Sequence, residues 1–145
     1  MDDVVSTYEV LLVEDDPGDV ALISEAFAAH RLPSRLHTTG DGVEALTFLR
    51  REGPFIGVPR PDLILLDLNM PRMDGRELLA VVKTDPDLYT IPVVVFTTSD
   101  RPDDVTISYT RHANAYVAKP LDLHQLDHAI DRIHTFYGEL VSRPR

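Results

Sequence analysis

Leu63-Ile64-Leu65-Leu66-Asp67 is the stretch that decides the fold, because four apolar residues in a row end at a carboxylate. The run is too short for a buried helix, and it is apolar at every position rather than at alternate ones. This pattern predicts a strand that is covered on both faces of a parallel sheet. Similar runs occupy positions 9–13, 91–96 and 115–118, and a weaker one at 36–39 fits a strand near an edge.

Helical patterns lie between these runs. Val20, Ile23 and Phe27 share one face after Pro17, which can open a helix at its first turn. Comparable apolar stripes lie within 43–49, 78–82 and 126–137. Alternating strands and helices predict an α/β fold, here a flavodoxin-like doubly wound five-stranded parallel sheet of order 2-1-3-4-5 with five helices.

The segment 102–112 differs from the other helical patterns. Only Val105 and Tyr109 form a convincing apolar pair in it, so we expect a loosely held helix. The last helix is expected to run on to about Leu140 and to carry Phe136 and Tyr137 near its end.

A polar residue stands at the end of each main apolar run, and together these residues suit one kind of chemistry. The first strand ends in Glu14-Asp15-Asp16, the third in Asp67, the fourth in Thr97 and the fifth in Lys119. In open parallel sheets, ligands bind at these carboxyl ends, near the switch point between strands 1 and 3. Clustered carboxylates repel one another unless a cation offsets their charge, and Mg²⁺ is commonly held by one or two carboxylates plus waters. Asp67 would then be a nucleophile in phosphoryl transfer, with Mg²⁺, Lys119 and the Thr97 hydroxyl each facing one phosphoryl oxygen.

Four blocks of sequence carry a resemblance to a known family. The blocks are Val13-Glu14-Asp15-Asp16-Pro17, Leu66-Asp67-Leu68-Asn69-Met70-Pro71-Arg72-Met73-Asp74-Gly75, Thr97-Thr98-Ser99 and Ala118-Lys119-Pro120. Thr97 follows Asp67 by 30 positions, and Lys119 follows it by 52. In order and spacing the blocks resemble the receiver domain of bacterial two-component response regulators, over roughly residues 8–141.

The resemblance implies a set of Mg²⁺ ligands. Asp15 is similar to the family's direct metal ligand, and Glu14 to the acid that binds through water. Asp67 is similar to the phosphoacceptor, which also binds metal, and Asn69 to the residue whose backbone carbonyl completes the protein ligands. Asp16 lies one place beyond the usual acidic pair, so we interpret it as a surface or helix-start acid.

The resemblance also implies a switch. Thr97 and Lys119 match the family's other catalytic residues, and Thr97 with Tyr116 matches its switch pair. Phosphorylation of Asp67 would draw Thr97 toward the phosphoryl group and let Tyr116 turn inward. The reshaped face would be that of the helix at 102–112, the strand at 115–118 and the last helix, which are helix 4, strand 5 and helix 5 in chain order. The bond between Lys119 and Pro120 is cis in the family, and we expect the same here.

A narrower resemblance is to the single-domain response regulators paired with bacterial phytochrome kinases. It rests on Glu14 to Asp19, on the long connection at 51–61, and on Ser108-Tyr109 ahead of Ala113-Asn114-Ala115-Tyr116. One position departs from the pattern, because His112 stands where a glycine usually ends a helix left-handed. Histidine tolerates that conformation at some cost, so we expect a shifted or strained helix end. The implied partner is a histidine kinase, of the bacterial phytochrome type in this narrower interpretation.

Length and charge fit one soluble domain, residues 1–145 with a core at about 8–141. A chain of 145 residues can bury roughly 70% of its unfolded surface. It has 24 acidic and 14 basic side chains, and a net charge of −10 disfavours nucleic acid. It has no cysteine, no secretory signal and no stretch near the ~20 apolar residues that span a bilayer.

We therefore expect a cytoplasmic protein that binds neither nucleic acid nor membrane. With the receiver filling the chain, its output is expected to be protein contact, including a homodimer through helix 4, strand 5 and helix 5 that uses Tyr109, Phe136 and Tyr137.

Two other functions use the same fold. A metal-dependent phosphohydrolase would also use Asp67, but such phosphatases often carry an acid two residues on, where this chain has Asn69. A nucleotide or flavin binder would need a Gly-rich loop after strand 1, where this chain has acids. We expect a signalling domain rather than an enzyme. Such a domain catalyses only its own phosphorylation and dephosphorylation and switches between two conformations.

Overall fold

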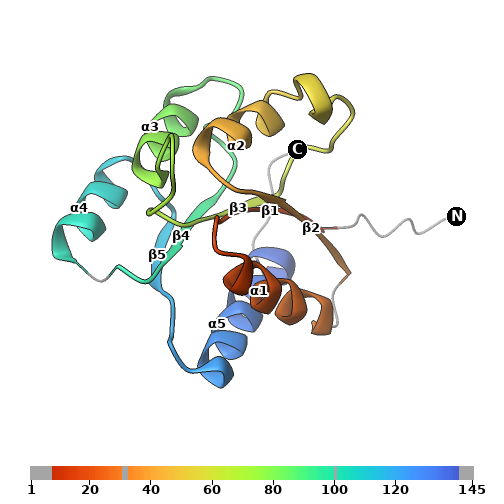
Figure 1. Ribbon diagram of the computed structural model, residues 1–145, viewed down its shortest axis with the longest axis vertical. Helices are drawn as coiled ribbons and strands as arrows, with labels where there is room; N and C mark the ends of the chain where they lie inside the picture. The colour runs from red at the N-terminus through yellow and green to blue at the C-terminus, as the bar shows by residue number, and fades with distance from the viewer. Residues whose placement is uncertain (1–7, 31–32, 100, 141–145) are drawn as a thin grey trace, which may run out of the picture.

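A five-stranded parallel sheet forms the centre of the molecule in the computed structural model, which describes residues 8–30, 33–99 and 101–140. The strands lie in the order β2-β1-β3-β4-β5, and the predicted fold is confirmed (Figure 1). Their bounds are β1 Tyr8–Val13, β2 Ser34–Thr39, β3 Leu63–Leu66, β4 Val93–Thr97 and β5 Ala115–Ala118.

Helices cover both faces of the sheet. They are α1 Pro17–Ala29, α2 Gly42–Leu49, α3 Gly75–Thr84, α4 Pro102–Thr110 and α5 Leu123–Thr135. A short 3-10 helix, Gly53–Phe55, lies in the long connection after α2, and a π-helical turn, Phe136–Leu140, continues α5. Figure 1 shows α1 and α5 on one face and α2, α3 and α4 on the other. The expectation that the last helix reaches Leu140 is confirmed.

The uninterrupted apolar runs form the core, as their pattern predicts. Every residue of β1, β3 and β4 is buried, so alternate side chains supply the two hydrophobic clusters on opposite faces of the sheet. Burying one such leucine or valine contributes about 1.5–3 kcal/mol, so these three strands are the most firmly held part of the fold. Their carboxyl ends are fixed in place by this packing.

The helix starts follow ordinary capping chemistry. Asp16 caps α1 by accepting a hydrogen bond from the Gly18 backbone at 3.0 Å, which confirms it as a helix-start acid. Asp74 and Glu77 form a capping box at the start of α3. These caps hold the first turns of α1 and α3 beside the carboxyl ends of β1 and β3.

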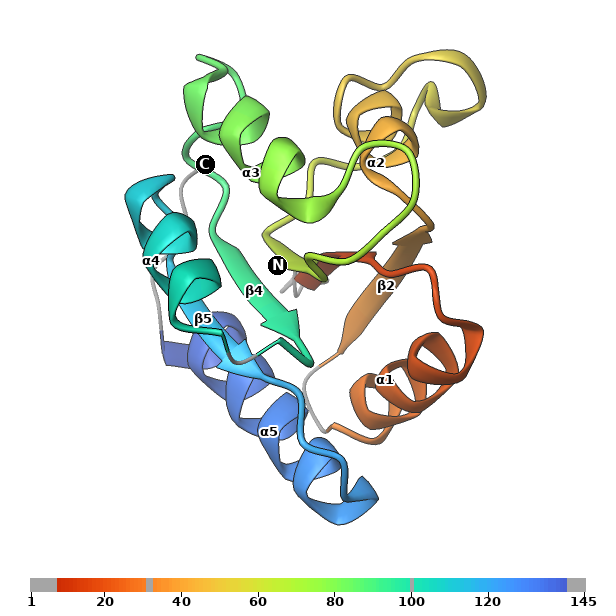
Figure 2. The same ribbon diagram turned by 60° about the vertical axis from the view of Figure 1, so that its left-hand side comes forward.

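Helix α4 is held more by polar than by apolar contacts. Its buried residues are Asp104 and Ser108, whereas Tyr109 of the predicted apolar pair is 51% exposed. Sparse apolar anchoring is therefore confirmed, and Tyr109 contributes little to it. Figures 1 and 2 show α4 alongside β5 at the edge of the molecule.

The end of α4 takes the expected left-handed form. His112 has φ 70°, and the backbone N–H groups of His112 and Ala113 donate to Tyr109 and Ser108, which is a Schellman motif. The expected cis bond between Lys119 and Pro120 is not found, because this peptide bond is trans in the structure. The trans isomer is the one that X–Pro bonds generally favour, by about 0.5–1 kcal/mol. Among the described residues, no helix is long and apolar enough to cross a membrane.

Candidate functional site

The carboxyl ends of four neighbouring strands bring the predicted residues to one place. Glu14 and Asp15 follow β1, Asp67 follows β3, Thr97 ends β4 and Lys119 follows β5. Two backbone hydrogen bonds fix this edge: Asp67 donates to Val13 at 3.0 Å, and Lys119 donates to Thr97 at 2.7 Å. The sheet register alone therefore brings these side chains close together, without any contact between the side chains themselves.

Three carboxylates form a group suited to a divalent cation. Glu14, Asp15 and Asp67 each offer an oxygen, and these oxygens lie within 4.8 Å of one another. Glu14 and Asp67 are buried, and Asp15 is exposed, which leaves one side of the group open to solvent. Burial and the neighbouring Asp67 charge raise the pKa of Glu14 to about 7, against the opposing effect of Lys119. A hard dication would offset this repulsion, and oxygen ligands with an open side suit Mg²⁺ or Mn²⁺.

Asn69 lies in the loop that follows β3, beside this group. Its backbone N–H donates to Oδ1 of Asp67 at 3.4 Å, and its side chain is exposed. The predicted role of its carbonyl oxygen as a metal ligand stays a prediction.

Lys119 reaches into the acidic group from β5. Its ammonium donates to Glu14 and, at 2.9 Å, to Oδ2 of Asp19, and it lies 3.9 Å from Oδ2 of Asp67. Burial works to lower the pKa of Lys119, but the hydrogen bonds to Glu14 and Asp19 outweigh it and raise the pKa. The side chain is therefore a fixed positive charge within reach of Asp67.

Asp19 is a residue that the sequence analysis did not assign to the site. It lies in the first turn of α1, and its carboxylate reaches across to Lys119. An acid at that place is also common as a helix-start residue, because it interacts favourably with the helix dipole. The sequence alone held no signal that separated the two roles.

Thr97 and Tyr116 both contact Ser99. Thr97 is fully buried, and its hydroxyl oxygen lies 3.5 Å from the backbone N of Ser99. The Tyr116 hydroxyl donates to the Ser99 carbonyl at 2.6 Å, and the Tyr116 ring packs against the cluster under α2 and α3. The ring is thus on the inner side of β5, and the predicted switch pair shares one contact residue.

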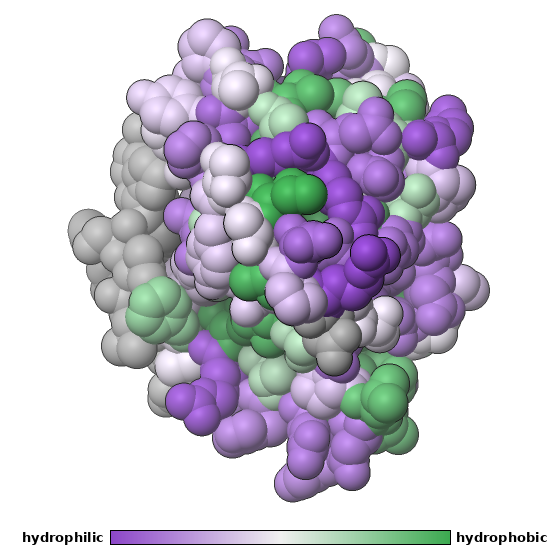
Figure 3. All heavy atoms as spheres, turned by 90° about the vertical axis from the view of Figure 1, so that its left-hand side faces the viewer, coloured by the Kyte–Doolittle hydropathy of each residue, from purple (hydrophilic) through white to green (hydrophobic). Residues whose placement is uncertain are grey.

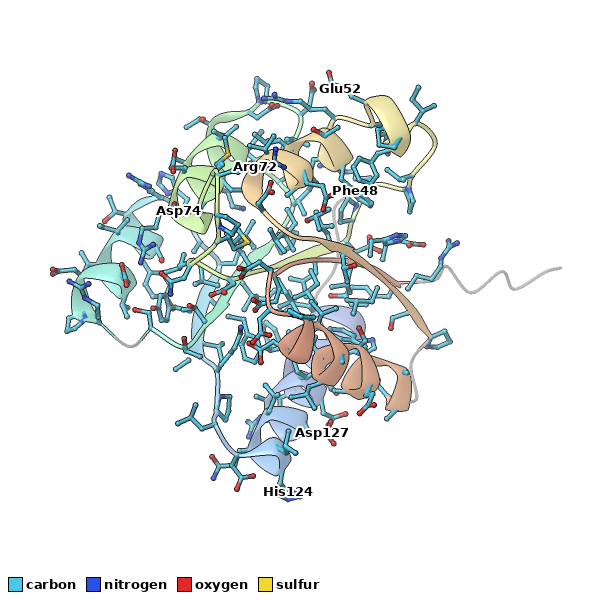
Figure 4. The ribbon with its side chains drawn as sticks, viewed as in Figure 1. Phe48, Glu52, Arg72, Asp74, His124 and Asp127 are labelled. Atoms are coloured by element: carbon cyan, nitrogen blue, oxygen red, sulfur yellow. The ribbon has the colours of Figure 1, made fainter. Side chains whose placement is uncertain are left out.

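Two loops that border the site are tied to each other. Arg72, which has φ 61°, makes an ion pair of 2.7 Å with Asp41, the N-cap of α2. The Gly42 backbone donates to the Met73 carbonyl at 2.9 Å, and a Cβ at Gly42 would lie only 2.6 Å from that oxygen. Figure 4 shows Arg72 and Asp74 on this loop, between β3 and α3. These contacts tie the part of the loop that follows Asn69 to the start of α2.

Comparisons with known proteins agree with this arrangement. Residues 10–131 match the response regulator receiver domain family, and the chain belongs to that family. The protein is thus a receiver domain of two-component signalling.

Two of its relatives are similar to the chain over at least 90% of its length. Response regulator Rcp1 of Synechocystis sp. is 44% identical over 135 residues, which are 93% of this chain and 92% of that protein. The probable methanogenesis regulatory protein FilR2 of Methanothrix harundinacea is 39% identical, over 90% of this chain and 83% of that protein.

Two solved structures resemble the chain over nearly its whole length. The phosphorylated cyanobacterial phytochrome response regulator RcpA has a TM-score of 0.93 at 44% identity, covering 97% of this chain and 100% of that one. The Mn²⁺-bound form of Rcp1 has a TM-score of 0.90 at 43% identity, covering 95% of this chain and 99% of that one. The resemblance to phytochrome-associated regulators is confirmed.

Proposed function

We propose that the protein accepts a phosphoryl group from a histidine kinase on Asp67, in a Mg²⁺-dependent reaction, and signals through protein contacts. The observation that carries the proposal is the convergence of Glu14, Asp15, Asp67 and Lys119 at one edge of the sheet. Two relatives support it: one is described in a phosphorylated form, the other with bound Mn²⁺.

The chemistry assigns each residue a task. A carboxylate oxygen of Asp67 attacks phosphorus, and the electron pair of the broken bond leaves with the imidazole of the kinase histidine. Mg²⁺ held by Glu14, Asp15, Asp67 and the Asn69 carbonyl would supply positive charge to the phosphoryl oxygens. Lys119 neutralises a second phosphoryl oxygen.

Thr97 would move toward Asp67, and its hydroxyl would donate to the remaining phosphoryl oxygen. Because the Tyr116 ring already lies on the inner side of β5, Tyr116 would respond through its hydrogen bond to the Ser99 carbonyl. Thr97, Tyr116 and Lys119 thereby connect a charge on Asp67 to the outer face of β5. Hydrolysis of the acyl phosphate, with water as the nucleophile at phosphorus, restores the Asp67 carboxylate and resets the switch.

Labelling by acetyl phosphate tests this proposal. With Mg²⁺, the protein is expected to gain one phosphoryl group, and Asp67→Asn or a chelator should abolish the gain. Lys119→Ala should bind Mg²⁺ as well as or better than the wild type, because a nearby positive charge is lost, yet label poorly. Intact-mass spectrometry measures the labelling, and equal labelling of Asp67→Asn would disprove the assignment.

The partner is proposed to be a kinase of the phytochrome type in the cytoplasm. Support comes from RcpA, which is described as a phytochrome response regulator, and from the acidic charge of −10, which disfavours nucleic acid as a direct target. In this proposal the whole chain acts as one receiver domain with a core at about 8–141.

A homodimer through α4, β5 and α5 is the proposed form of output. Phe136 is 49% exposed and packs edge-on against Tyr137, beside a cavity of about 390 Å³ that β5 and α5 line together. Figure 3 faces this side of the molecule and shows green hydrophobic patches between purple hydrophilic ones. Tyr137 also packs on the protein's own core, so Phe136 and Tyr109 offer the freer apolar surface.

Light scattering at several concentrations tests the dimer. The mass should approach two chains in the wild type and fall for Phe136→Ala/Tyr109→Ala, and added salt should favour association by screening the acidic charge. A monomeric mass at every concentration, with and without acetyl phosphate, rules the dimer out.

A further inference from the structure

Polar contacts determine how α4 is attached to the rest of the protein. The two buried residues of this helix are Asp104 and Ser108, and its larger apolar residues Ile107 and Tyr109 are 37% and 51% exposed. Apolar burial therefore contributes little to the position of α4. Its attachment must come chiefly from directional contacts, which are made or lost as units.

Asp104 makes a charged contact with α3. The Arg76 side chain, on α3, donates from Nε to Oδ1 of Asp104 at 2.9 Å, and a terminal nitrogen lies at the same distance. The side chains of Asp104 and Arg76 are 9% and 25% exposed, so water screens this pair only in part. Arg76 also approaches the Leu68 carbonyl at 3.4 Å, directly after Asp67.

Ser99 joins this ion pair to the switch residues. Its hydroxyl donates to Oδ2 of Asp104 at 2.6 Å, and its carbonyl accepts from the Tyr116 hydroxyl at 2.6 Å. Its backbone N lies 3.5 Å from the Thr97 hydroxyl oxygen, two residues away on the same strand end. A displacement of Thr97 is thus passed to Ser99 through both the backbone and this contact.

We propose that Arg76 and Asp104 are positioning residues that hold Ser99, and that through Ser99 they couple the movement of Thr97 to the position of α4. The inference rests on the proposed phosphorylation of Asp67, whose effect it would relay. A movement of Ser99 would then affect both Tyr116 and α4, because the Tyr116 hydroxyl and the Asp104 carboxylate of α4 both form hydrogen bonds with Ser99.

The ion pair gives the coupling a defined geometry. Both carboxylate oxygens of Asp104 are used, one by Arg76 and the other by Ser99, so Ser99 cannot move far without loosening α4. A second contact ties the end of α4 to α3, since Arg111 donates to the Arg76 carbonyl at 2.8 Å. The N-terminal half of α4 is therefore the part expected to respond.

Hydrogen exchange across residues 102–112 tests the anchoring, first without any phosphoryl probe. Asp104→Asn keeps an acceptor for Ser99 but loses the charge opposite Arg76. Hydrogen exchange across residues 102–112 should therefore become roughly 10- to 100-fold faster. Asp103→Asn is the matched control, because it removes the same charge from the same helical turn at an exposed position. The strand β1 is the internal reference for global unfolding.

The relay is tested with beryllofluoride and Mg²⁺. In the wild type, the probe should change exchange across 102–112 by several-fold. Ser99→Ala, which keeps the ion pair but loses the hydroxyl bond to Asp104, should exchange at an intermediate rate that the probe no longer changes, whereas Asp104→Asn should exchange fast in both conditions. A merely structural role of Ser99 would change the rate of exchange but would leave its response to the probe intact.

Each outcome decides the inference. Equal exchange of Asp104→Asn and Asp103→Asn overturns the anchoring, and a full probe-dependent change in Ser99→Ala overturns the relay. If exchange in β1 also rises in Asp104→Asn, Ser99→Ala decides alone. If acetyl phosphate leaves wild-type Asp67 unlabelled, the proposed function fails and the relay with it, while the comparison without probe still decides the anchoring.

Discussion

Gly75 begins α3 directly behind the proposed phosphoacceptor, and its replacement by alanine should open the metal site. A Cβ at this position would lie 2.2 Å from the carbonyl oxygen of Asp67 and 2.7 Å from the Cα of Leu68. Both are backbone atoms at the end of a buried strand, so no side chain can turn away to make room. Ordinary contact begins near 3.4 Å, so α3 and the end of β3 must separate by about 1 Å.

The size of the effect follows from that separation. Overpacking a well-packed site costs about 1–3 kcal/mol, which for a domain of this length lowers the unfolding temperature by roughly 3–10 °C. A 1 Å misplacement near reacting groups costs on the order of 100-fold in rate. Labelling of Asp67 by acetyl phosphate should therefore fall much further than stability does, and Mg²⁺ affinity should fall with it.

Calorimetry and intact-mass labelling measure both effects on one preparation. Gly40→Ala is the control, because a Cβ at Gly40 meets nothing within 4 Å. It should match the wild type in unfolding temperature, Mg²⁺ affinity and labelling rate. Wild-type values of all three for Gly75→Ala would refute the packing argument, and a loss of stability without a loss of labelling would refute its connection to the site.

Three further substitutions or conditions give sharp expectations. His112→Gly should raise the unfolding temperature by about 3 °C in a thermal melt, because a left-handed non-glycine residue costs about 1–2 kcal/mol and glycine recovers part of it; a lower temperature contradicts this. Asp19→Asn should increase labelling at limiting acetyl phosphate by roughly 2- to 10-fold, because Lys119 loses a competing anion; unchanged labelling would show that Asp19 does not compete. The pKa of Glu14 is about 7 in the metal-free folded protein, against 4.5 for an unperturbed glutamate. Proton binding to Glu14 therefore stabilises the folded protein fully below about pH 4.5, and this stabilisation is lost as the pH rises through 7. Mg²⁺ affinity in titration calorimetry should therefore rise between about pH 6 and about pH 8, and a flat profile would contradict the assignment of Glu14 to the metal group.

The sheet and the site could be predicted together because one signal carries both. A run such as Leu63–Leu66 indicates a strand buried on both faces, and the parallel connection then brings every strand's carboxyl end to the same edge. Asp67 and Lys119 needed no contact information to be placed near each other. The geometry around them follows from backbone register, which the alternation of strands and helices already implies.

Contacts between distant side chains could not be predicted in the same way. Asp19 and Lys119 are 100 positions apart, and the pattern of α1 gives Asp19 the same appearance as any first-turn acid. Asp104 likewise stands among charged residues at a helix start, where its neighbour Asp103 is exposed and Asp104 is buried. Only the packing of α3 against α4 shows which of the two acids is buried.

The contrast between the sheet and α4 explains how a small change at Asp67 can be read at the surface. Moving β3 or β4 would disturb many buried apolar side chains, each contributing about 1.5–3 kcal/mol, so the strands stay where they are. Moving α4 requires little apolar exposure, and its cost is set mainly by the bonds of Asp104. A charge added at Asp67 has only to redirect Ser99 to change that cost. In the proposed switch, the rigid sheet therefore holds the chemistry in place, and the polar inner face of α4 makes this helix the part that moves.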